Sequence, residues 1–354
     1  MFKAFKEQDI QRHTIFFNQK EFENKHREST ILITGAAGTI GREISILLNK
    51  SKVKKIIFFD QSEIGLHNLK EDLSILNQNN GKLIFILGSI RDKIKIRHVL
   101  KKNHVNLIIH TAAYKHVAIL EEDLYEAIRT NVEGTINLYE ESIKNNVSDF
   151  VFISSDKAVK PISLMGMSKK IAEIYLDSSK NSSDVTTKII RCGNVINSSG
   201  SILPTFMNQI KNTKSINLKS ETATRYFIYA DVVATSILNI VSSDLNGKFV
   251  LEMGNSIKIK QLAKDMIENS KFKNININLT HLNKGEKVYE SLKEDYEAYK
   301  STKDNAIKII EDHRKKPFSY VKEILELVEQ NKKMNLSKVK MGLHTLCNKN
   351  SSLK

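Results

Sequence analysis

Short apolar runs alternate with longer amphipathic stretches from residue 31 onward. The runs are bounded by polar residues, are rich in β-branched side chains, and lie at Ile31–Ile33, Lys55–Phe59, Leu83–Leu87, Val105–Ile109, Phe150–Ile153 and Lys188–Ile190. The stretches between them, such as Ile40–Leu48 and Glu126–Ile143, space their apolar residues as a helix does. Short buried strands that alternate with helices predict an α/β fold in which helices cover both faces of a parallel sheet.

A glycine-rich turn joins the first expected strand to its helix. In ILITGAAGTIGREI, Gly35 permits the tight turn, Gly38 lets the backbone approach a pyrophosphate, and Gly41 lets the helix pack on the strand. Asp60 ends the second strand about 20 residues further on, where a carboxylate would accept hydrogen bonds from a ribose. The pattern predicts a dinucleotide site. Asp60, with no Arg beside it, favours NAD over NADP, because a 2′-phosphate would meet a carboxylate. The alternative is a glycine-rich turn of another α/β fold.

These signals predict a Rossmann, doubly wound parallel sheet with a small C-terminal substrate-binding lobe. The charged first residues and the polar, Lys-rich last residues do not join the alternation. The expected division is an N-terminal arm or short helix at 1–29, an NAD-binding domain at 30–195 with 225–255 returning to it, a lobe at 196–224 and 256–330, and a basic flexible tail at 331–354.

The fourth expected strand ends in HTAAYKHV. The small residues Ala112 and Ala113 would let a cofactor lie close to the backbone. Lys115 and His116 follow at the carboxyl edge of the sheet, where open α/β folds bind ligands. Each also has a plainer interpretation, because Lys115 suits an exposed surface equally well and a lone His near a turn is more often a structural hydrogen-bond donor.

Composition narrows the class of protein. The formal net charge is +15, but the lysines are scattered and Trp is absent, so a basic and aromatic nucleic-acid surface is not expected. No apolar run is long enough to span a membrane and no signal-peptide pattern is present, which predicts a cytoplasmic protein without an integral membrane segment. Cys192 and Cys347 lie far apart and no Cys/His cluster has zinc spacing, so neither a disulfide nor a metal site is expected.

A series of motifs resembles the extended short-chain dehydrogenase/reductase superfamily and, within it, the bacterial UDP-N-acetylglucosamine 4,6-dehydratases of capsule and glycan biosynthesis. In chain order they are TGAAGTIG, FFDQSE, HTAAYKHV, TNVEGTINL, SSDKAVKPISLMGMSKKIAE, RCGNVINSSGSILPTF, TRYF and GEKVYESL, and they cover roughly residues 30–300. The resemblance implies oxidation at C4 of the sugar with hydride passing to NAD, loss of water across C5–C6, and return of the hydride to C6. The product would be a UDP-4-keto-6-deoxy-N-acetylhexosamine.

The resemblance also implies a catalytic group. Met165 stands where relatives have a Tyr, four residues before Lys169, so the acid and base must lie elsewhere. Asp156 would protonate the leaving hydroxyl, and Lys157 would take the C5 proton if burial and Lys169 lower its pKa. Lys169 would hydrogen-bond the nicotinamide ribose, and Ser155 would relay the C4 hydroxyl proton. The alternative for Asp156 and Lys157 is a solvent-exposed charged turn.

Cofactor and substrate contacts follow from the motifs and the resemblance together. Those expected for the cofactor are Gly35, Gly38, Thr39, Ile40, Gly41, Asp60, Ser62, Ser89, Ile90, Ala112, Ala113, Lys115, Asn131 and Lys169. Those expected for a UDP-sugar are Lys115, Asn194, Ser199, Ser201, Arg225 and Glu286, each of which could instead be a cap or loop residue.

Three positions depart from the family pattern. Asn283 replaces an Arg expected on the diphosphate, Ser89 replaces an Asp expected at the adenine, and Ala118 replaces a Pro. Rival functions are a UDP-sugar C4 epimerase and a non-catalytic NAD-binding regulator. The superfamily resemblance further implies a homo-oligomer.

Overall fold

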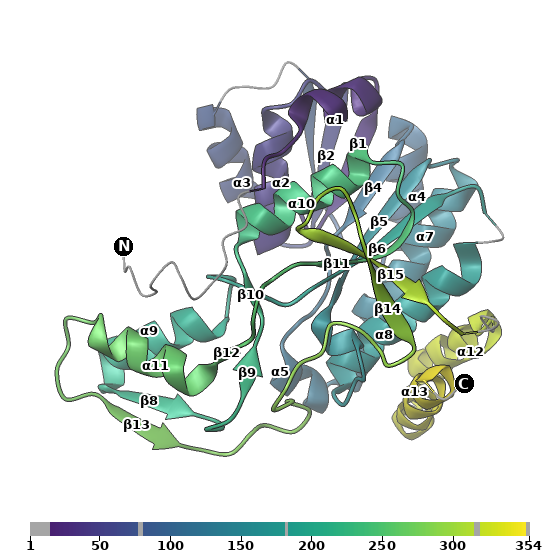
Figure 1. Cartoon of the computed structure of the whole chain (residues 1–354). Helices are drawn as coiled ribbons and strands as arrows, with labels where there is room; N and C mark the ends of the chain where they lie inside the picture. Colours follow the sequence, from purple (N-terminus) through teal and green to yellow (C-terminus); the bar gives the residue numbers. More distant parts are fainter. Residues whose placement is uncertain (1–14, 77–80, 181–182, 315–318, 352–354) are drawn as a thin grey trace.

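The computed structural model describes residues 15–76, 81–180, 183–314 and 319–351. Within these residues a nine-stranded sheet forms the centre of the molecule (Figure 1). Its strands, in spatial order, are β14 (Glu297–Ser301), β15 (Ile307–Asp312), β11 (Gly247–Leu251), β6 (Thr186–Cys192), β5 (Asp149–Ser155), β4 (Leu107–His110), β1 (Thr30–Thr34), β2 (Lys55–Asp60) and β3 (Lys82–Leu87). The strands from β3 to β11 pair in parallel, whereas β15 and β14 join antiparallel. The chain order reverses between β1 and β4, which is where such sheets bind ligands.

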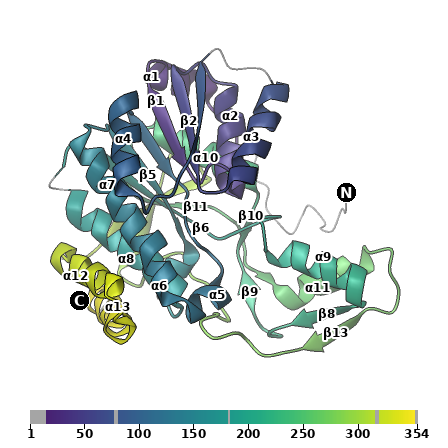
Figure 2. The same cartoon turned by 180° about the vertical axis from the view of Figure 1, so that it is seen from behind.

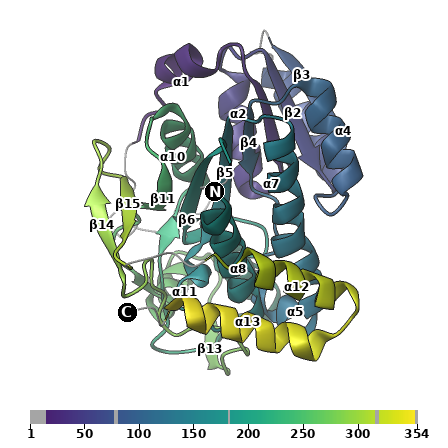
Figure 3. The same ribbon diagram turned by 90° about the vertical axis from the view of Figure 1, so that its right-hand side faces the viewer.

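Helices cover both faces of this sheet (Figure 3), as the alternation predicted. On one face lie α2 (Thr39–Asn49), α3 (Glu63–Leu76) and α10 (Ala230–Ser242). On the other lie α4 (Lys93–Asn103), α5 (Val117–Glu122), α6 (Leu124–Ala127), the π-helical turn η1 (Ile128–Glu133), α7 (Gly134–Lys144) and α8 (Leu164–Ser179). Each strand packs against both helical layers because its side chains alternate between the two faces of the sheet. In β1, Ile31 and Ile33 face the layer of α2, α3 and α10, and Leu32 faces the other layer. The expected Rossmann architecture is therefore confirmed.

A small lobe lies beside the carboxyl edge of the sheet (Figures 1 and 2). It contains α9 (Ile202–Thr213), β8 (Ser215–Leu218), β9 (Thr224–Arg225), β12 (Ile257–Lys258), α11 (Ile259–Glu268) and β13 (Asn276–Leu279). Its own core includes Leu203, Phe206, Ile216 and Leu262, all buried. The short pair β7 (Asn194–Val195) and β10 (Phe227–Ile228) joins the lobe to the sheet.

The last third of the chain departs from expectation in two places. Strands β14 and β15, which were expected in the lobe, extend the main sheet, because β15 pairs with the open edge of β11. The residues expected as a tail form α13 (Leu336–Ser351), which follows α12 (Val321–Lys332) and packs across α8 (Figure 3). The expectation of a flexible tail is wrong there, because Val339, Leu343 and Leu346 share one helical face and are buried. Residues 352–354 lie outside the described residues.

At the other end, α1 (Gln19–His26) packs on α10 through the buried Phe22. The expected arm therefore includes a helix on the outer layer, and residues 1–14 lie outside the described residues. Across the part of the chain that the structure describes, no helix combines the length and the apolar character needed to cross a membrane.

Candidate active site

The turn after β1 has the geometry of a phosphate-binding loop. Gly35 has φ +70°, and a Cβ atom there would lie 2.6 Å from the backbone nitrogen of Ala112. A Cβ on Gly41 would lie 2.1 Å from the Gly35 carbonyl oxygen. Only glycine fits either place. Helix α2 begins directly after Gly38, so its free N–H groups and positive dipole end lie at the mouth of the turn, where an anion is stabilised.

Asp60 lies beside this turn at the end of β2. Its Oδ2 accepts a hydrogen bond from the Ala37 N–H at 3.0 Å, and its Oδ1 accepts one from the Ser62 N–H at 2.9 Å. Because a carboxylate oxygen has more than one acceptor site, both oxygens can still accept from a ribose hydroxyl. The glycine cradle and this carboxylate together fit a dinucleotide.

A cavity of about 1230 Å³ opens next to the turn, between the carboxyl edge of the sheet and the lobe. Six of the residues expected at the cofactor line it: Gly38, Thr39, Ile40, Ala113, Lys115 and Lys169. The others, which do not line it, are Gly35, Gly41, Asp60, Ser62, Ser89, Ile90, Ala112 and Asn131. All six residues expected at the substrate line the cavity: Lys115, Asn194, Ser199, Ser201, Arg225 and Glu286.

Asn131 has a different place from the one expected. It is buried in η1, where its side chain accepts from the Tyr114 N–H at 2.8 Å and donates to the Tyr114 carbonyl at 2.9 Å and to Ser168 Oγ at 3.0 Å. It therefore fixes the loop that carries Lys115 and His116 into the cavity. Burial lowers the pKa of Lys115, and burial followed by the charge of Lys115 lowers the pKa of His116.

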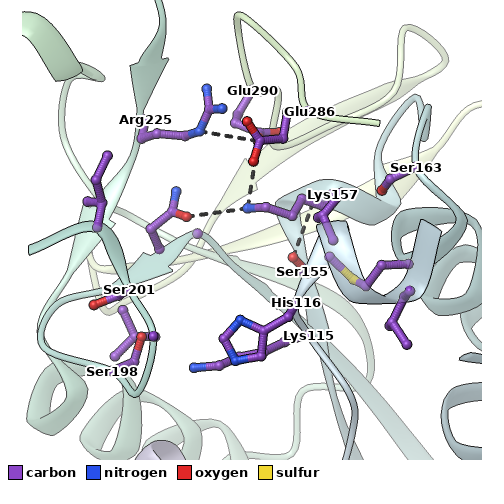
Figure 4. Close-up of a pocket in the computed structure, with 18 of the residues that line it drawn as sticks. Lys115, His116, Ser155, Lys157, Ser163, Ser198, Ser201, Arg225, Glu286 and Glu290 are labelled. Atoms are coloured by element: carbon purple, nitrogen blue, oxygen red, sulfur yellow. Dashed lines mark hydrogen bonds and ion pairs between the residues drawn. The ribbon is translucent and has the colours of Figure 1, made fainter. Parts of the chain in front are cut away.

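The end of β5 brings Ser155, Asp156 and Lys157 together, and Figure 4 shows Ser155 and Lys157 at the cavity. Asp156 is fully buried, and its Oδ1 accepts from Ser155 Oγ at 2.9 Å and from Lys157 Nζ at 3.1 Å. Its Oδ2 has no hydrogen-bond partner among the described residues. Asp156 itself does not line the cavity, but its two partners Ser155 and Lys157 do, so a proton can pass between Asp156 and the cavity through them. The alternative of an exposed charged turn does not fit this burial.

Lys157 Nζ lies between acceptors on both sides. It is 3.1 Å from Asp156 Oδ1, 3.3 Å from Asn194 Oδ1 and 3.6 Å from Glu290 Oε1. Burial alone would lower the pKa of Lys157, but the charges of Asp156 and Glu290 outweigh it and raise the pKa. The expected lowering is therefore wrong, because two carboxylates face Lys157 and Lys169 does not offset them.

Lys169 and Met165 share the first turns of α8. Lys169 Nζ donates to the Ile153 carbonyl at 2.7 Å and lies 4.0 Å from the centre of the Phe152 ring. Burial lowers the pKa of Lys169 to about 7. Met165 is 3% exposed and packs with Leu120 while also lining the cavity. It is an apolar wall of the cavity and carries no proton.

Arg225 and Glu286 face the cavity from the lobe side (Figure 4). The guanidinium of Arg225 donates to the Lys287 carbonyl at 2.7 Å and to the Val288 carbonyl at 3.1 Å, so it clamps this loop. Glu286 accepts from Lys219 at 2.6 Å and from the Asn283 amide at 3.2 Å. Asn283 therefore orients a cavity carboxylate in place of supplying the cation that the family pattern has there.

The remaining lobe residues cluster at the start of α9. Gly200 has φ +66°, and a Cβ there would lie 2.4 Å from His116 Cε1, so the turn sits directly on that ring. Ser199 lines the cavity in this turn, and Ser201, at the N-terminus of α9, keeps a buried Oγ without a hydrogen-bond partner among the described residues. Ser201 lies on the side of the cavity opposite Lys157 (Figure 4).

Among the cavity residues that escaped the sequence reasoning, three form ion pairs within the site: Glu290, Lys287 and Lys219. Glu290 and Lys287 lie in the GEKVYESL motif, in a segment without helix or strand, so no periodicity marks which side chains turn inward. Lys219 follows β8 and resembles the many surface lysines of this chain. The one available signal was that Lys287 and Glu290 are charged residues within a motif already assigned to the site.

Comparison with known proteins identifies relatives across most of the chain. The model of the family described as polysaccharide biosynthesis protein matches residues 31–312. The capsular polysaccharide biosynthesis protein CapD of Staphylococcus aureus is 34% identical over 326 residues, which are 91% of this chain and 53% of CapD. A UDP-glucose 4-epimerase of Rickettsia rickettsii is 34% identical over 274 residues, 75% of this chain and 77% of the epimerase.

Among solved structures, Pen from Bacillus thuringiensis matches with a TM-score of 0.69 and 31% identity, covering 74% of this chain and 80% of Pen. The chain spans about half the length of the first curated relatives that it matches. The family model nevertheless covers far more than half of the chain, and the matched region contains the glycine turn, the β5 cluster and the lobe. The chain belongs to the polysaccharide biosynthesis protein family.

Proposed function

We propose that this protein is an NAD-dependent nucleotide-sugar 4,6-dehydratase that acts on UDP-N-acetylglucosamine to supply surface polysaccharide synthesis. The observation that carries the proposal is the ion pair between Lys157, which lines the cavity next to the glycine turn, and the fully buried Asp156, 3.1 Å away. Loss of the C6 hydroxyl needs an acid and removal of the C5 proton needs a base. A C4 epimerase needs no acid at C6.

Different residues would bind the different parts of the cofactor. The α2 N-terminus and the glycine turn would hold the pyrophosphate of NAD, and Asp60 would hold the adenosine ribose. Lys169 would bind the nicotinamide ribose. NAD would supply a hydride acceptor at C4 and a hydride donor at C6. Lys157 would return its proton to C5 as the hydride reaches C6, and the C4 hydroxyl proton, relayed by Ser155, would replace the proton that the pair loses with the leaving water.

The acid and base arise together from one ion pair. Lys157 and Asp156 lie 3.1 Å apart, so one proton can pass from the ammonium group to the carboxylate. This transfer leaves a neutral amine that can take the C5 proton and a carboxylic acid that can protonate the leaving hydroxyl. A sugar that fills the cavity excludes water, and desolvation favours the neutral pair. The raised pKa of Lys157 is thus compatible with a base role, since the proton is passed inside the pair.

The lobe would bind the nucleotide. Ser199 and Ser201 at the start of α9 can donate hydrogen bonds to a diphosphate, and the free N–H groups of that helix end favour an anion. Glu286 can accept from the uridine ribose. Arg225 supports the loop that carries Glu286 and stands within reach of a nucleotide at the cavity wall.

The deciding experiment is incubation with UDP-N-acetylglucosamine followed by NMR of the product. The proposal predicts a C6 methyl signal and a C4 ketone. A C4-inverted sugar that retains its C6 hydroxymethyl group would instead establish the epimerase, which the Rickettsia relative favours. NAD binding without turnover would establish a regulator. A cytoplasmic location and a homo-oligomer remain predictions.

A further inference from the structure

Glu290 is a buried carboxylate that no part of the proposed reaction uses. Its side chain is 2% exposed, and it faces three cations, of which Figure 4 labels Lys157 and Arg225. Oε1 lies 3.6 Å from Lys157 Nζ and 3.6 Å from Arg225 Nε, and Oε2 lies 3.8 Å from Lys287 Nζ. Oε2 accepts no hydrogen bond from any described residue. Burying a carboxylate is costly unless the group is paired with opposite charges and hydrogen-bonded.

The segment that carries Glu290 is fixed on both sides. Before it, the carbonyl of Val288 accepts from the Thr224 N–H at 3.0 Å and from Arg225. After it, Glu294 pairs with Lys170 at 2.6 Å in the interior, so the segment is tied to α8. The position of Glu290 beside Lys157 is therefore built into the fold and does not depend on a loose loop.

Few other groups lie close enough to Lys157 to influence whether it is protonated. Asp156 carries a negative charge on one side, Asn194 is neutral, and Arg225 and Lys287 are positive. Glu290 is thus the second carboxylate at Lys157 and the one that comes from a different part of the chain. Without it, Lys157 would face one carboxylate and two cations.

We propose that Glu290 is a positioning residue for Lys157, whose carboxylate holds the Lys157 ammonium group beside Asp156 in its charged form until a sugar fills the cavity. The catalytic meaning of this inference rests on the proposed function. The charge of Glu290 opposes transfer of the proton from Lys157 to Asp156 in the empty site. Oε2 lies 3.8 Å from Lys287 Nζ but accepts no hydrogen bond from any described residue, so a sugar hydroxyl that reached Glu290 could donate to it, and that contact would draw the Glu290 charge away from Lys157.

Competitive acetylation tests the inference without any turnover. Acetic anhydride reacts with neutral amines only, so the rate at Lys157, followed by mass spectrometry at pH 8.5, reports the neutral fraction. Removal of an opposite charge at this distance lowers a pKa by about one unit or more. Glu290→Gln, which keeps shape and access, should therefore raise the Lys157 rate at least about tenfold.

The matched control is Asp295→Asn. It removes the same charge from the same segment, but Asp295 pairs with the exposed Lys160 at 2.5 Å. Its expected effect is an unchanged rate at Lys157. Glu290→Asp retains the charge and should stay within about twofold of wild type, and thermal melts establish that each variant is folded.

An unchanged Lys157 rate in Glu290→Gln would overturn the inference. If that variant does not fold, a tenfold rise in Glu290→Asp would overturn it equally, because the charge is still present there. The proposed function fails on a separate result: a protein that shows the acetylation effect but never converts UDP-N-acetylglucosamine refutes the dehydratase alone.

Discussion

At the residue scale, the proposed chemistry depends on Asp156 and Lys157. Asp156→Asn and Lys157→Ala should each reduce dehydration by about 10²–10⁴-fold, because each removes a general acid or base. NAD should still bind, since neither side chain lies in the glycine turn. NMR of the product measures the loss of turnover, and fluorescence measures whether NAD still binds. Near-wild-type turnover in both variants would mean that the acid and base lie elsewhere.

Substitutions at Met165 distinguish a role in packing from a role in proton transfer. Met165→Leu should be mild, because it keeps volume beside Leu120 and removes no proton carrier. Met165→Ala should be worse, since it opens space next to the sugar. The kinetic signature is a higher KM in Met165→Ala with solvent deuterium still entering C5 of the product. Loss of C5 deuterium in Met165→Leu would contradict a purely apolar role.

Asp60 is expected to determine cofactor choice. Asp60→Ala should weaken NAD binding by tenfold or more, because a hydrogen bond to a charged group contributes about 1.5–3 kcal/mol. NADP binding should suffer much less. Asp60→Asn, which keeps one acceptor for the Ala37 and Ser62 N–H groups, controls for damage to the turn. Equal losses for NAD and NADP by calorimetry would show that Asp60 does not touch the ribose.

At the scale of elements, one buried ion network ties strands to a helix. Arg191 on β6 donates to Glu173 on α8 at 2.7 Å and to Glu297 on β14 at 2.6 Å, all with side chains at most 1% exposed. Arg191→Met leaves two buried carboxylates without their partner and should cost about 3–5 kcal/mol of unfolding free energy. Urea unfolding at pH 7 measures the loss, and Lys300→Met, at the exposed pair with Glu311, should lose far less.

The same network predicts acid sensitivity. Burial alone would raise the pKa of Glu173, but the Arg191 charge outweighs it and lowers the pKa, and the same holds for Glu297. Because the folded pKa lies below the unfolded value of about 4.5, this stability is present above pH 4.5 and lost as pH falls. The unfolding free energy of wild type should therefore drop steeply below pH 4.5. A slope that Arg191→Met leaves unaltered would argue against this source.

Sequence reasoning succeeded where a local pattern corresponds to a local structure. The places of the glycine turn, Asp60 and the Asp156–Lys157 pair at strand ends could be predicted because strand ends and turn glycines are visible in the sequence, whereas the roles of Asp156 and Lys157 came from the family resemblance and stay predictions. Glu290 escaped because its inward direction is set by Arg225 and by Lys170 at the far end of the segment. The sign of the Lys157 pKa shift escaped for the same reason, since one of its two causes is that unseen carboxylate.

At the scale of the whole molecule, α13 completes the layer over α8. Leu343 is fully buried between these helices, so Leu343→Ala should cost about 2–5 kcal/mol. Met341, two residues earlier and 66% exposed, is the matched control, and Met341→Ala should change stability by less than about 0.5 kcal/mol. Thermal unfolding of both variants is the measurement. Equal melting temperatures would mean that α13 does not contribute to the folded core.

The position of β11 between β6 and β15 has a consequence for synthesis on the ribosome. When β6 has left the ribosome, its outer edge stays unpaired until the first half of the lobe has been synthesised and β11 follows it. The edge of β11 then stays unpaired until β15 is made, and the face of α8 that α13 covers stays exposed for longer still. The nascent chain therefore presents an unpaired strand edge and an uncovered apolar helix face for much of its translation, and such surfaces recruit chaperones and other unfinished chains. Pauses in translation after β6 would thus be more harmful to this protein than pauses after β15.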